Sequence, residues 1–277
     1  MEIKTDLTVA YRIYPKISGS PAVFSDDKYK LSEFCLKSFK NSLGDLKVKM
    51  FVLLDNCPPK YKDLFLKYFD AEDLNFIELD GIGNQSTFSL QIKLLLNQKF
   101  SEIIYFAEDD YFYLPNQFRD MFDFLKENKD VDFVSPYDHL DYYKNTIHEY
   151  KTSIKLSKNR HWRTAGSTCL TFLTTKSVLQ KTKNTFLTYE KGNTDLGLWL
   201  SITKHSMNSP KILIKSSKNL FVLKSLYKIL LYNKTQIFRG KRWTLYVPIP
   251  SIATHLEKEY LSPSHDWEEI MEKYINE

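Results

Sequence analysis

Short apolar runs alternate with helical stripes through the first 110 residues, and this alternation constrains the fold more than any other feature of the chain. The strand-like runs span residues 7–11, 48–54, 74–79 and 103–107. Between them, apolar side chains recur every three or four positions, which is typical of amphipathic helices. This order predicts an α/β fold of Rossmann-like type, with a mostly parallel sheet flanked by helices. Ligands of such sheets bind beyond the carboxyl ends of the strands.

The second half of the chain has a less regular pattern. Residues 137–165 are polar and aromatic without a clear period, so we expect a long loop there. Residues 168–173 indicate a strand, and residues 194–204 indicate a helix with Thr194 as its N-cap. Because no strong linker divides the chain, we predict a main domain over residues 1–214 and a C-terminal extension over 215–277.

Composition excludes several classes of protein. Aromatic residues make up 15% of the 277 residues, which rules out a disordered chain, a collagen-like chain and a coiled coil. Gly occurs only 8 times, which disfavours a glycine-rich nucleotide fold. Three cysteines without metal-type spacing argue against a disulfide framework and a structural zinc, and favour a reducing compartment.

Charge and hydropathy bear on location and partners. The formal net charge of +5 is mild, and no nucleic-acid motif accompanies it, so we expect no nucleic-acid partner. The charged N-terminus is unlike a signal peptide, and we find no stretch of about 18 apolar residues that could span a membrane. We therefore expect a cytoplasmic protein.

Three consecutive acids are the most informative local feature. Glu108, Asp109 and Asp110 follow the strand-like run 103–107 directly. Their mutual repulsion costs energy unless a cation or hydrogen-bond donors compensate it. Two carboxylates on one edge of a sheet bind a hard divalent cation, typically together with substrate phosphates. A solvated acidic loop without a ligand is the simpler alternative.

The segment 105–111, YFAEDDY, resembles the acidic D-x-D-type motif of glycosyltransferases with the GT-A fold, most closely family 2. The resemblance covers roughly residues 7–200, and it rests on the strand order, the acidic triplet and a later Asp on a helix. It implies that Mn²⁺ or Mg²⁺ holds the diphosphate of a nucleoside-diphosphate sugar, with Asp110 as a metal ligand. Glu108 or Asp109 would contact the ribose or a metal-bound water. The Glu at the first position departs from the common form of the motif.

Asp195 lies at the start of the expected helix over residues 194–204. It could simply favour the positive end of the helix dipole. The resemblance implies instead a general base that takes a proton from an acceptor hydroxyl, because family 2 enzymes carry an acidic residue at a helix start after the metal site. One such carboxylate, opposite the leaving group, is what an inverting displacement needs.

The resemblance also implies further metal and donor contacts. A late histidine completes the metal shell in several GT-A enzymes, and His255, in a proline-rich segment, matches this better than His265. Topology and resemblance together place the donor base near five further side chains, which are Tyr11, Arg12, Asp55, Asn84 and Gln91. Arg163 precedes a Gly-Ser loop at residues 166–167 and could line the donor phosphates or the acceptor, with a purely structural role as the alternative.

Basic and apolar residues are interleaved over residues 218–246. Such a segment could lie on an anionic membrane surface at the inner face of the membrane, which would suit a lipid-linked acceptor. An ordinary amphipathic helix packed on the domain is the alternative.

Together, these features predict a metal-dependent, inverting glycosyltransferase that moves a sugar from a nucleoside-diphosphate sugar to a glycan acceptor hydroxyl, for example in surface polysaccharide assembly. On this reading residues 1–214 bind the donor and carry the catalytic groups, and residues 215–277 complete the site. Two alternatives remain open: a nucleotidyltransferase that makes nucleotide sugars, and a non-catalytic carbohydrate-binding protein.

Overall fold

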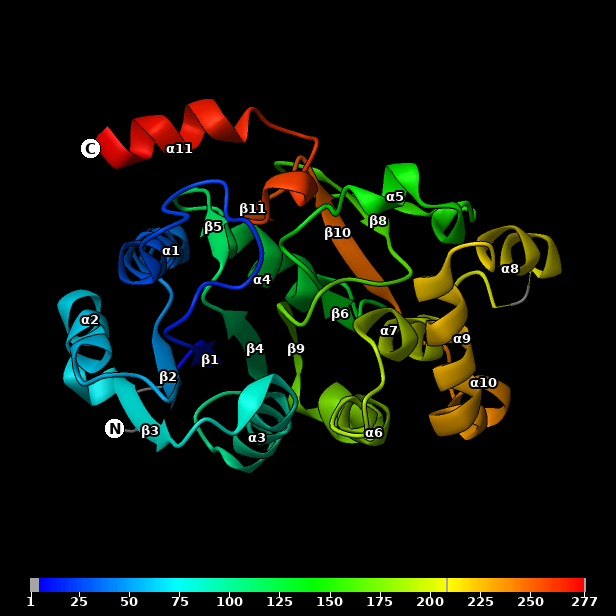
Figure 1. Ribbon diagram of the computed structural model, residues 1–277, viewed down its shortest axis with the longest axis horizontal. Helices are drawn as coiled ribbons and strands as arrows, with labels where there is room; N and C mark the ends of the chain where they lie inside the picture. The colour runs from blue at the N-terminus through cyan, green and yellow to red at the C-terminus, as the bar shows by residue number, and fades with distance from the viewer. Residues whose placement is uncertain (1–4, 208, 277) are drawn as a thin grey trace.

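A nine-stranded sheet with helices on both faces forms the framework of the molecule (Figure 1). The computed structural model describes residues 5–207 and 209–276. The strand order is β3-β2-β1-β4-β9-β6-β10-β8-β7, and a second, two-stranded sheet pairs β11 with β5. The strands are β1 (Leu7–Ile13), β2 (Val48–Asp55), β3 (Leu74–Leu79), β4 (Ile103–Glu108), β5 (Tyr111–Tyr113), β6 (Phe133–Val134), β7 (Ile154–Leu156), β8 (His161–Thr164), β9 (Phe172–Thr175), β10 (Leu245–Ile249) and β11 (Ala253–His255).

The helices cover the sheet from two sides. They are α1 (Lys28–Leu43), α2 (Lys60–Tyr68), α3 (Gly83–Asn97), α4 (Phe118–Glu127), α5 (Asp141–Lys144), α6 (Lys176–Phe186), α7 (Asp195–Thr203), α8 (Pro210–Ser216), α9 (Leu220–Tyr232), α10 (Lys234–Arg239) and α11 (Trp267–Asn276). Short 3₁₀ turns lie at Ala71–Asp73, Thr146–His148, Leu187–Tyr189 and Lys258–Tyr260. The expected α/β class and the mostly parallel sheet flanked by helices are confirmed.

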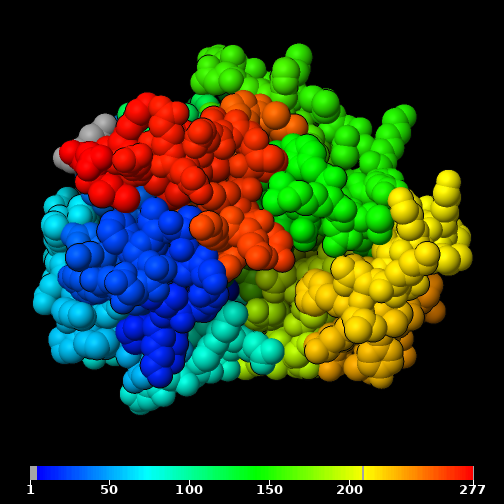
Figure 2. Space-filling view, turned by 45° about the horizontal axis from the view of Figure 1, so that its top comes forward, coloured from blue at the N-terminus to red at the C-terminus, as the bar shows by residue number. Residues whose placement is uncertain are grey.

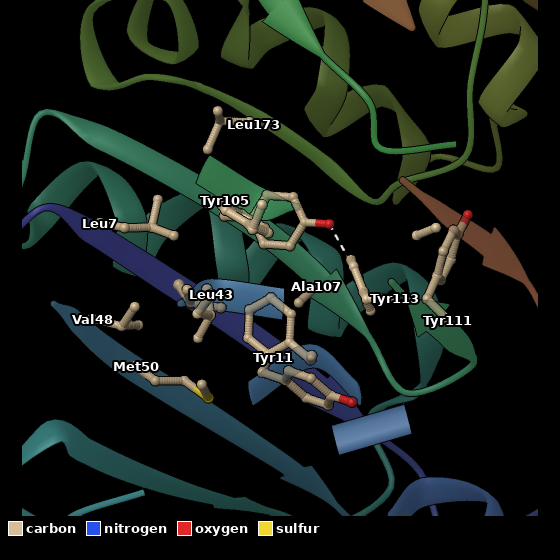
Figure 3. Packing of buried hydrophobic residues seen from close by; sticks show 14 of the residues in the cluster. Leu7, Tyr11, Leu43, Val48, Met50, Tyr105, Ala107, Tyr111, Tyr113 and Leu173 are labelled. Atoms are coloured by element: carbon tan, nitrogen blue, oxygen red, sulfur yellow. Dashed lines mark hydrogen bonds between the residues drawn. The ribbon is translucent and has the colours of Figure 1, made fainter. Parts of the chain in front are cut away.

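The side chains of β1 and β4 alternate between two hydrophobic cores, one on each face of the sheet. Tyr11 and Tyr105 point into the core formed with α1, α2 and α4, where Tyr105 and Tyr113 join their hydroxyls at 2.8 Å (Figure 3). Ala10 and Phe106 point to the opposite core, formed with α3, α6 and α7. This two-residue period is the geometric property of a strand that lies between two layers of helices.

The parallel part of the sheet, β3-β2-β1-β4, places its carboxyl ends at one edge. In register, Arg12 of β1 lies opposite Leu53 of β2 and Glu108 of β4. Asp55 of β2 lies opposite Leu79 at the end of β3. The four strands expected from the sequence therefore form as predicted, and their polar ends open onto a common edge.

Two segments differ from the sequence expectation. Residues 137–165 are not a continuous loop, because α5 and the β7–β8 hairpin form within them. The hairpin lies at the edge of the sheet, where Ile154 and Leu156 are exposed, so its apolar residues show no clear buried period. The strand expected over residues 168–173 begins only at Phe172.

The C-terminal segment enters the main sheet. β10 lies between β6 and β8, and β11 runs antiparallel to β5 so that His255 faces Tyr111. α11 packs on α1 through contacts that include Trp267 and Phe34. The division at residue 215 stays a prediction, and these strands show how the C-terminal residues come to lie beside the ends of the parallel strands.

None of the helices formed by residues 5–207 and 209–276 combines the length and apolar character required to cross a bilayer.

The expected N-cap of α7 is confirmed, because the Thr194 hydroxyl accepts a hydrogen bond from the backbone of Gly197 at 3.0 Å. We expect Thr194→Ala to lower the free energy of unfolding by about 1 kcal/mol, as loss of an N-cap does. Urea denaturation measures this change. Thr235→Ala, at an exposed site of α10, is the matched control and should change stability by less than about 0.5 kcal/mol. Equal losses in both variants would contradict a specific role of the cap.

Candidate functional site

A cleft of about 330 Å³ lies beyond the carboxyl ends of β1, β2 and β4. Six of the residues predicted for the site line it, and they come from three strand ends and the start of α3. They are Arg12, Asp55, Asn84, Glu108, Asp109 and Asp110. The structure therefore brings together residues up to 98 positions apart in the sequence, from Arg12 to Asp110.

Each of the three acids at the end of β4 has its own basic partner. Glu108 forms a close ion pair with Arg12 and accepts a hydrogen bond from the Thr171 hydroxyl at 2.7 Å. Asp109 lies 2.7 Å from the ammonium group of Lys28. The pairing offsets much of the repulsion that three adjacent carboxylates would otherwise impose.

Asp110 is paired with His255, whose Nε2 lies 3.1 Å from the Asp110 Oδ2. Burial would raise the pKa of Asp110, but the charge and hydrogen bond of His255 outweigh it and the pKa is lowered. Burial would likewise lower the pKa of His255, and the Asp110 carboxylate raises it instead. The two groups therefore favour the charged form in each other.

Asp109 behaves differently from Asp110, although the two are adjacent. Burial raises its pKa, the Lys28 charge opposes that rise, and the nearby Asp110 carboxylate adds to it. Its other contact is the backbone N–H of Tyr14, which donates at 3.2 Å. Asp109 thus ties the loop after β1 and the first turn of α1 to the end of β4.

Lys28 is a site residue that the sequence analysis missed. It lies in the first turn of α1, behind the N-cap Asp27. A cation there is repelled by the positive end of the helix dipole, so it needs a compensating anion. This unfavourable position is the feature of the sequence that could have indicated an acidic partner for Lys28. Thr171, just before β9, was also missed and carries no comparable signal.

The geometry at Asp110 fits a divalent cation that is shared with a ligand. Asp110 Oδ1 is buried and has no hydrogen-bond partner among the residues that the structure describes. A small cavity of about 10 Å³ beside Asp110, His255 and Lys28 has room for about one water or ion. Within the described part of the chain, no three His, Cys, Asp or Glu side chains gather into a metal site. A cation held by Asp110 and His255 would replace the proton that His255 carries in this pair, because only a neutral imidazole binds a metal. It would take its remaining ligands from phosphate and water, not from an all-protein cage.

The predicted donor-binding residues Asp55, Asn84 and Arg12 are connected to one another through the start of α3. The two Asp55 carboxylate oxygens accept the backbone N–H groups of Ile82 and Gly83 at 2.8 and 2.9 Å. The Arg12 guanidinium donates to the Asn84 side chain and, at 2.9 Å, to its backbone carbonyl. These contacts fix the loop between β3 and α3 at the wall of the cleft.

Three of the predicted donor-binding residues are not in the cleft. Tyr11 is 1% exposed and lies among the side chains of the core (Figure 3). Its ring packs edge-on against Phe65 at 5.2 Å, so it cannot stack on a donor base. Tyr11 and Arg12 are adjacent on a strand, and only one of them can face the carboxyl-end cleft. Gln91 is fully buried and donates to the carbonyls of Ala10 and Ala107, so it connects β1 and β4 to helix α3.

Arg163 is the third residue outside the cleft. Its guanidinium donates to Asp138 at 2.8 Å and lies over the rings of Tyr142 and Tyr143 at 4.7 and 4.5 Å. Because Asp138 is fully buried, it already supplies the counter-charge of this arginine. Arg163 therefore stabilises the segment before β7. Its guanidinium contacts Asp138 and the two tyrosines, and it does not reach the cleft where the donor was expected.

Asp195 lines a second cavity of about 470 Å³. Burial raises its pKa to about 6, with a further contribution from the Glu108 charge and an opposing one from Arg12. The second cavity also has His255 on its wall, while Asp110 lines the first cleft. The Asp110–His255 pair therefore stands between the two spaces.

Five of the fourteen residues that line the second cavity come from the segment 137–165, which was expected to be a loop. Burial lowers the pKa of His139 to about 4 and that of His148 to about 3, so both imidazoles are neutral near pH 7. Most of the other lining residues have aromatic, hydroxyl or amide side chains, among them Tyr142, Asn145, Thr168, Asn219, Phe221 and Tyr260, and the lining also includes Asp141, Cys169 and Leu196. The cavity offers mainly hydrogen-bonding groups and rings.

No protein-family model matches the sequence, and no curated protein matches it. Among solved structures, S. aureus TarS aligns over 64% of this chain and 30% of that chain, at 13% identity and a TM-score of 0.40. S. aureus TarS 1-349 in complex with UDP-GlcNAc aligns over 64% of this chain and 47% of that chain, at 14% identity and a TM-score of 0.42.

A cytidylyltransferase from Leptospira borgpetersenii serovar Hardjo-bovis (strain JB197) aligns over 65% of this chain and 63% of that chain, at 15% identity and a TM-score of 0.36. The chain spans less than two thirds of the length of each of these three proteins. Similarity at this level assigns no function, which leaves the geometry of the two cavities as the basis for one.

The buried pair of Lys28 and Asp109 gives a test of the site's charge balance. We expect Lys28→Met to lower the free energy of unfolding by about 3–5 kcal/mol, because Asp109 is left as an uncompensated buried charge. Denaturant unfolding measures the loss. The double variant Lys28→Met with Asp109→Asn should recover most of that stability. Equal stability of Lys28→Met and the unaltered protein would show that the pair does not carry this charge balance.

Proposed function

We propose that this protein is a metal-dependent, inverting glycosyltransferase that transfers a sugar from a nucleoside-diphosphate sugar to a glycan acceptor hydroxyl. The observation that carries the proposal is the pair of cavities that meet at Asp110 and His255. One has a buried, unpaired carboxylate oxygen at the ends of parallel strands, and the other has a carboxyl group with a raised pKa.

The first cleft is suited to the donor. Asp110 and His255 would hold Mn²⁺ or Mg²⁺, which supplies charge neutralisation to the departing diphosphate. Arg12 is held in the cleft by Glu108 and Asn84, so its charge is fixed in place before a ligand arrives. A fixed charge needs no reorganisation as negative charge develops on the diphosphate.

The second cavity is suited to the acceptor. His139 and His148 on its wall are neutral, and its aromatic rings and hydroxyls match an uncharged ligand that is rich in hydroxyl groups. Asp195 would accept the proton of the attacking hydroxyl. In the same step that oxygen bonds to the anomeric carbon, and the bond from this carbon to the phosphate oxygen breaks. The nucleoside diphosphate leaves with the electron pair.

Asp110 is the residue on which donor binding should depend. With a nucleoside diphosphate at about a hundredfold above its Kd, we expect Mn²⁺-dependent stabilisation of roughly 5–10 °C in the melting temperature. Asp110→Ala should abolish the Mn²⁺-dependent part and lower transfer by at least about 10²–10³, as loss of one well-placed electrostatic contact does. Thermal shift and a transfer assay measure both effects.

Asp63→Ala, at an exposed carboxylate of α2, is the control and should leave both values unchanged. Transfer by Asp110→Ala within about threefold of the unaltered protein would remove Asp110 from the mechanism. Release of pyrophosphate from a nucleoside triphosphate would favour a nucleotidyltransferase instead. Glycan binding without metal or nucleotide would favour a carbohydrate-binding protein.

Asp195 should control the pH dependence of transfer. Only its ionised form accepts a proton, so we expect kcat/KM to rise with pH and to level off above its pKa of about 6. Asp195→Asn should lose transfer while it keeps the metal-dependent thermal shift with nucleoside diphosphate. Normal transfer by Asp195→Asn, or an unchanged rate through pH 6 in the unaltered protein, would exclude it as the base.

A further inference from the structure

Helix α9 has an apolar face that no part of the described chain covers. Val222 and Ile229 are buried against α7 and its surroundings. The opposite side of the helix carries five large side chains, which are between 47% and 80% exposed. They are Leu220, Leu223, Tyr227, Leu230 and Leu231. Their spacing of three, four and seven residues places them in one stripe along the helix.

The neighbouring helices extend this apolar surface. Ile214 of α8 is 70% exposed and Phe238 of α10 is 75% exposed. Helices α8, α9 and α10 lie together at one end of the molecule (Figure 1), and the same segment, coloured yellow to orange, forms one edge of the space-filling view (Figure 2). An exposed apolar patch of this kind on a soluble domain usually marks an interaction site.

The charge around the stripe has a single sign. The sequence between Asp195 and Glu257 contains no acidic residue and ten Lys and Arg residues. Those in or beside α8–α10 that are exposed are Lys211, Lys215, Lys218, Lys224, Lys234, Arg239, Lys241 and Arg242. Two of them have acidic partners elsewhere in the described chain: Lys215 pairs with Glu149, and Lys241 lies 3.5 Å from Asp132.

We propose that α8–α10 dock on a membrane surface that contains anionic lipid. The stripe supplies side chains that partition into the boundary between headgroups and acyl chains, and the flanking lysines supply attraction to the lipid charge. A second copy of this chain is a poor occupant, because a symmetric contact would place two basic surfaces opposite each other. A nucleic acid would match the charge and leave the aliphatic stripe without a partner.

This surface adjoins the second cavity. Asn219 and Phe221, at the start of α9, line that cavity together with Asp195. If the cavity holds the acceptor, as the proposed function requires, docking would place its opening near the bilayer and suit an acceptor carried on a lipid. Membrane binding itself rests on α8–α10 alone and needs no nucleotide, so its failure is separable from failure of the proposed transfer.

Vesicle sedimentation tests the docking surface with the full chain. We expect the protein to bind vesicles of phosphatidylcholine with about 30% phosphatidylglycerol at low salt, and to bind pure phosphatidylcholine vesicles at least about tenfold more weakly. Raising the salt to about 0.5 M should weaken binding to the anionic vesicles, since screening acts on the lysine contribution. Absence of binding to the anionic vesicles at low salt would overturn the proposal.

Two sets of variants separate the two contributions. Lys211→Gln with Lys218→Gln and Lys224→Gln should lower partitioning by about a hundredfold. Leu223→Ser with Leu230→Ser and Leu231→Ser should lower it by at least about tenfold. Because the altered positions are exposed, both sets should keep the melting temperature of the unaltered protein, and this measurement excludes unfolding as the cause of lost binding.

The matched controls carry the same changes at exposed sites elsewhere. Lys93→Gln with Lys99→Gln and Lys129→Gln removes the same charge, and Ile154→Ser with Leu156→Ser removes apolar surface at the β7 edge. Both controls should bind vesicles as the unaltered protein does. Equal losses in controls and test variants would overturn the proposal. So would a dimer, seen by analytical ultracentrifugation, that the leucine variants dissociate while vesicle binding is unaffected.

Discussion

The one-to-one neutralisation of three adjacent carboxylates is the constraint on which the rest of the site depends. Two like charges about 4 Å apart near a protein surface repel by about 4 kcal/mol. The triplet at the end of β4 could not be partly buried without three separate counter-charges. Those come from three places in the chain: Arg12 on β1, Lys28 on α1 and His255 on β11. The fold therefore has to bring residues 12, 28 and 255 to one strand end. Arg12 lies there because β1 runs parallel to β4, and His255 because β11 runs antiparallel to β5. Lys28 lies there at the start of α1.

The residues at the ends of the parallel strands could be predicted from the sequence, because the strands themselves follow from the local hydrophobic pattern. Arg12 lies opposite Glu108 because β1 and β4 are parallel neighbours, and parallel strand ends with polar residues could be read from the sequence. Asp55 follows for the same reason. Strand geometry could also have shown that Tyr11 and Arg12 do not both face the cleft, since neighbouring residues on a strand point to opposite sides. Tyr11 belongs to the face that α1 and α2 cover, and its ring is part of the core.

The rest required long-range pairing that no local pattern encodes. His255 reaches Asp110 through a three-residue strand that pairs with β5 across more than 140 positions. The resemblance to a known motif suggested this histidine, and its own neighbourhood gave little sign of a strand. β10 is similar, because it lies between β6 and β8 in the middle of the sheet, yet the short apolar run Leu245–Ile249 was not recognised as a strand. Part of the second cavity was missed for a related reason, since five of its fourteen lining residues come from the segment 137–165, which has no clear hydrophobic period.

The position of the Asp110–His255 pair explains why two spaces of different character can adjoin. On the Asp110 side the groups are charged and held by ion pairs, and on the Asp195 side His139 and His148 are kept neutral by burial. A charged ligand is favoured in the first space and an uncharged, hydroxylated one in the second. Glu108 connects them electrostatically, because its charge contributes to the raised pKa of Asp195 while it holds Arg12 in the first cleft. The acidic triplet thus does more than offer a place for a cation, since Glu108 adds to the rise in the pKa of Asp195 that burial causes.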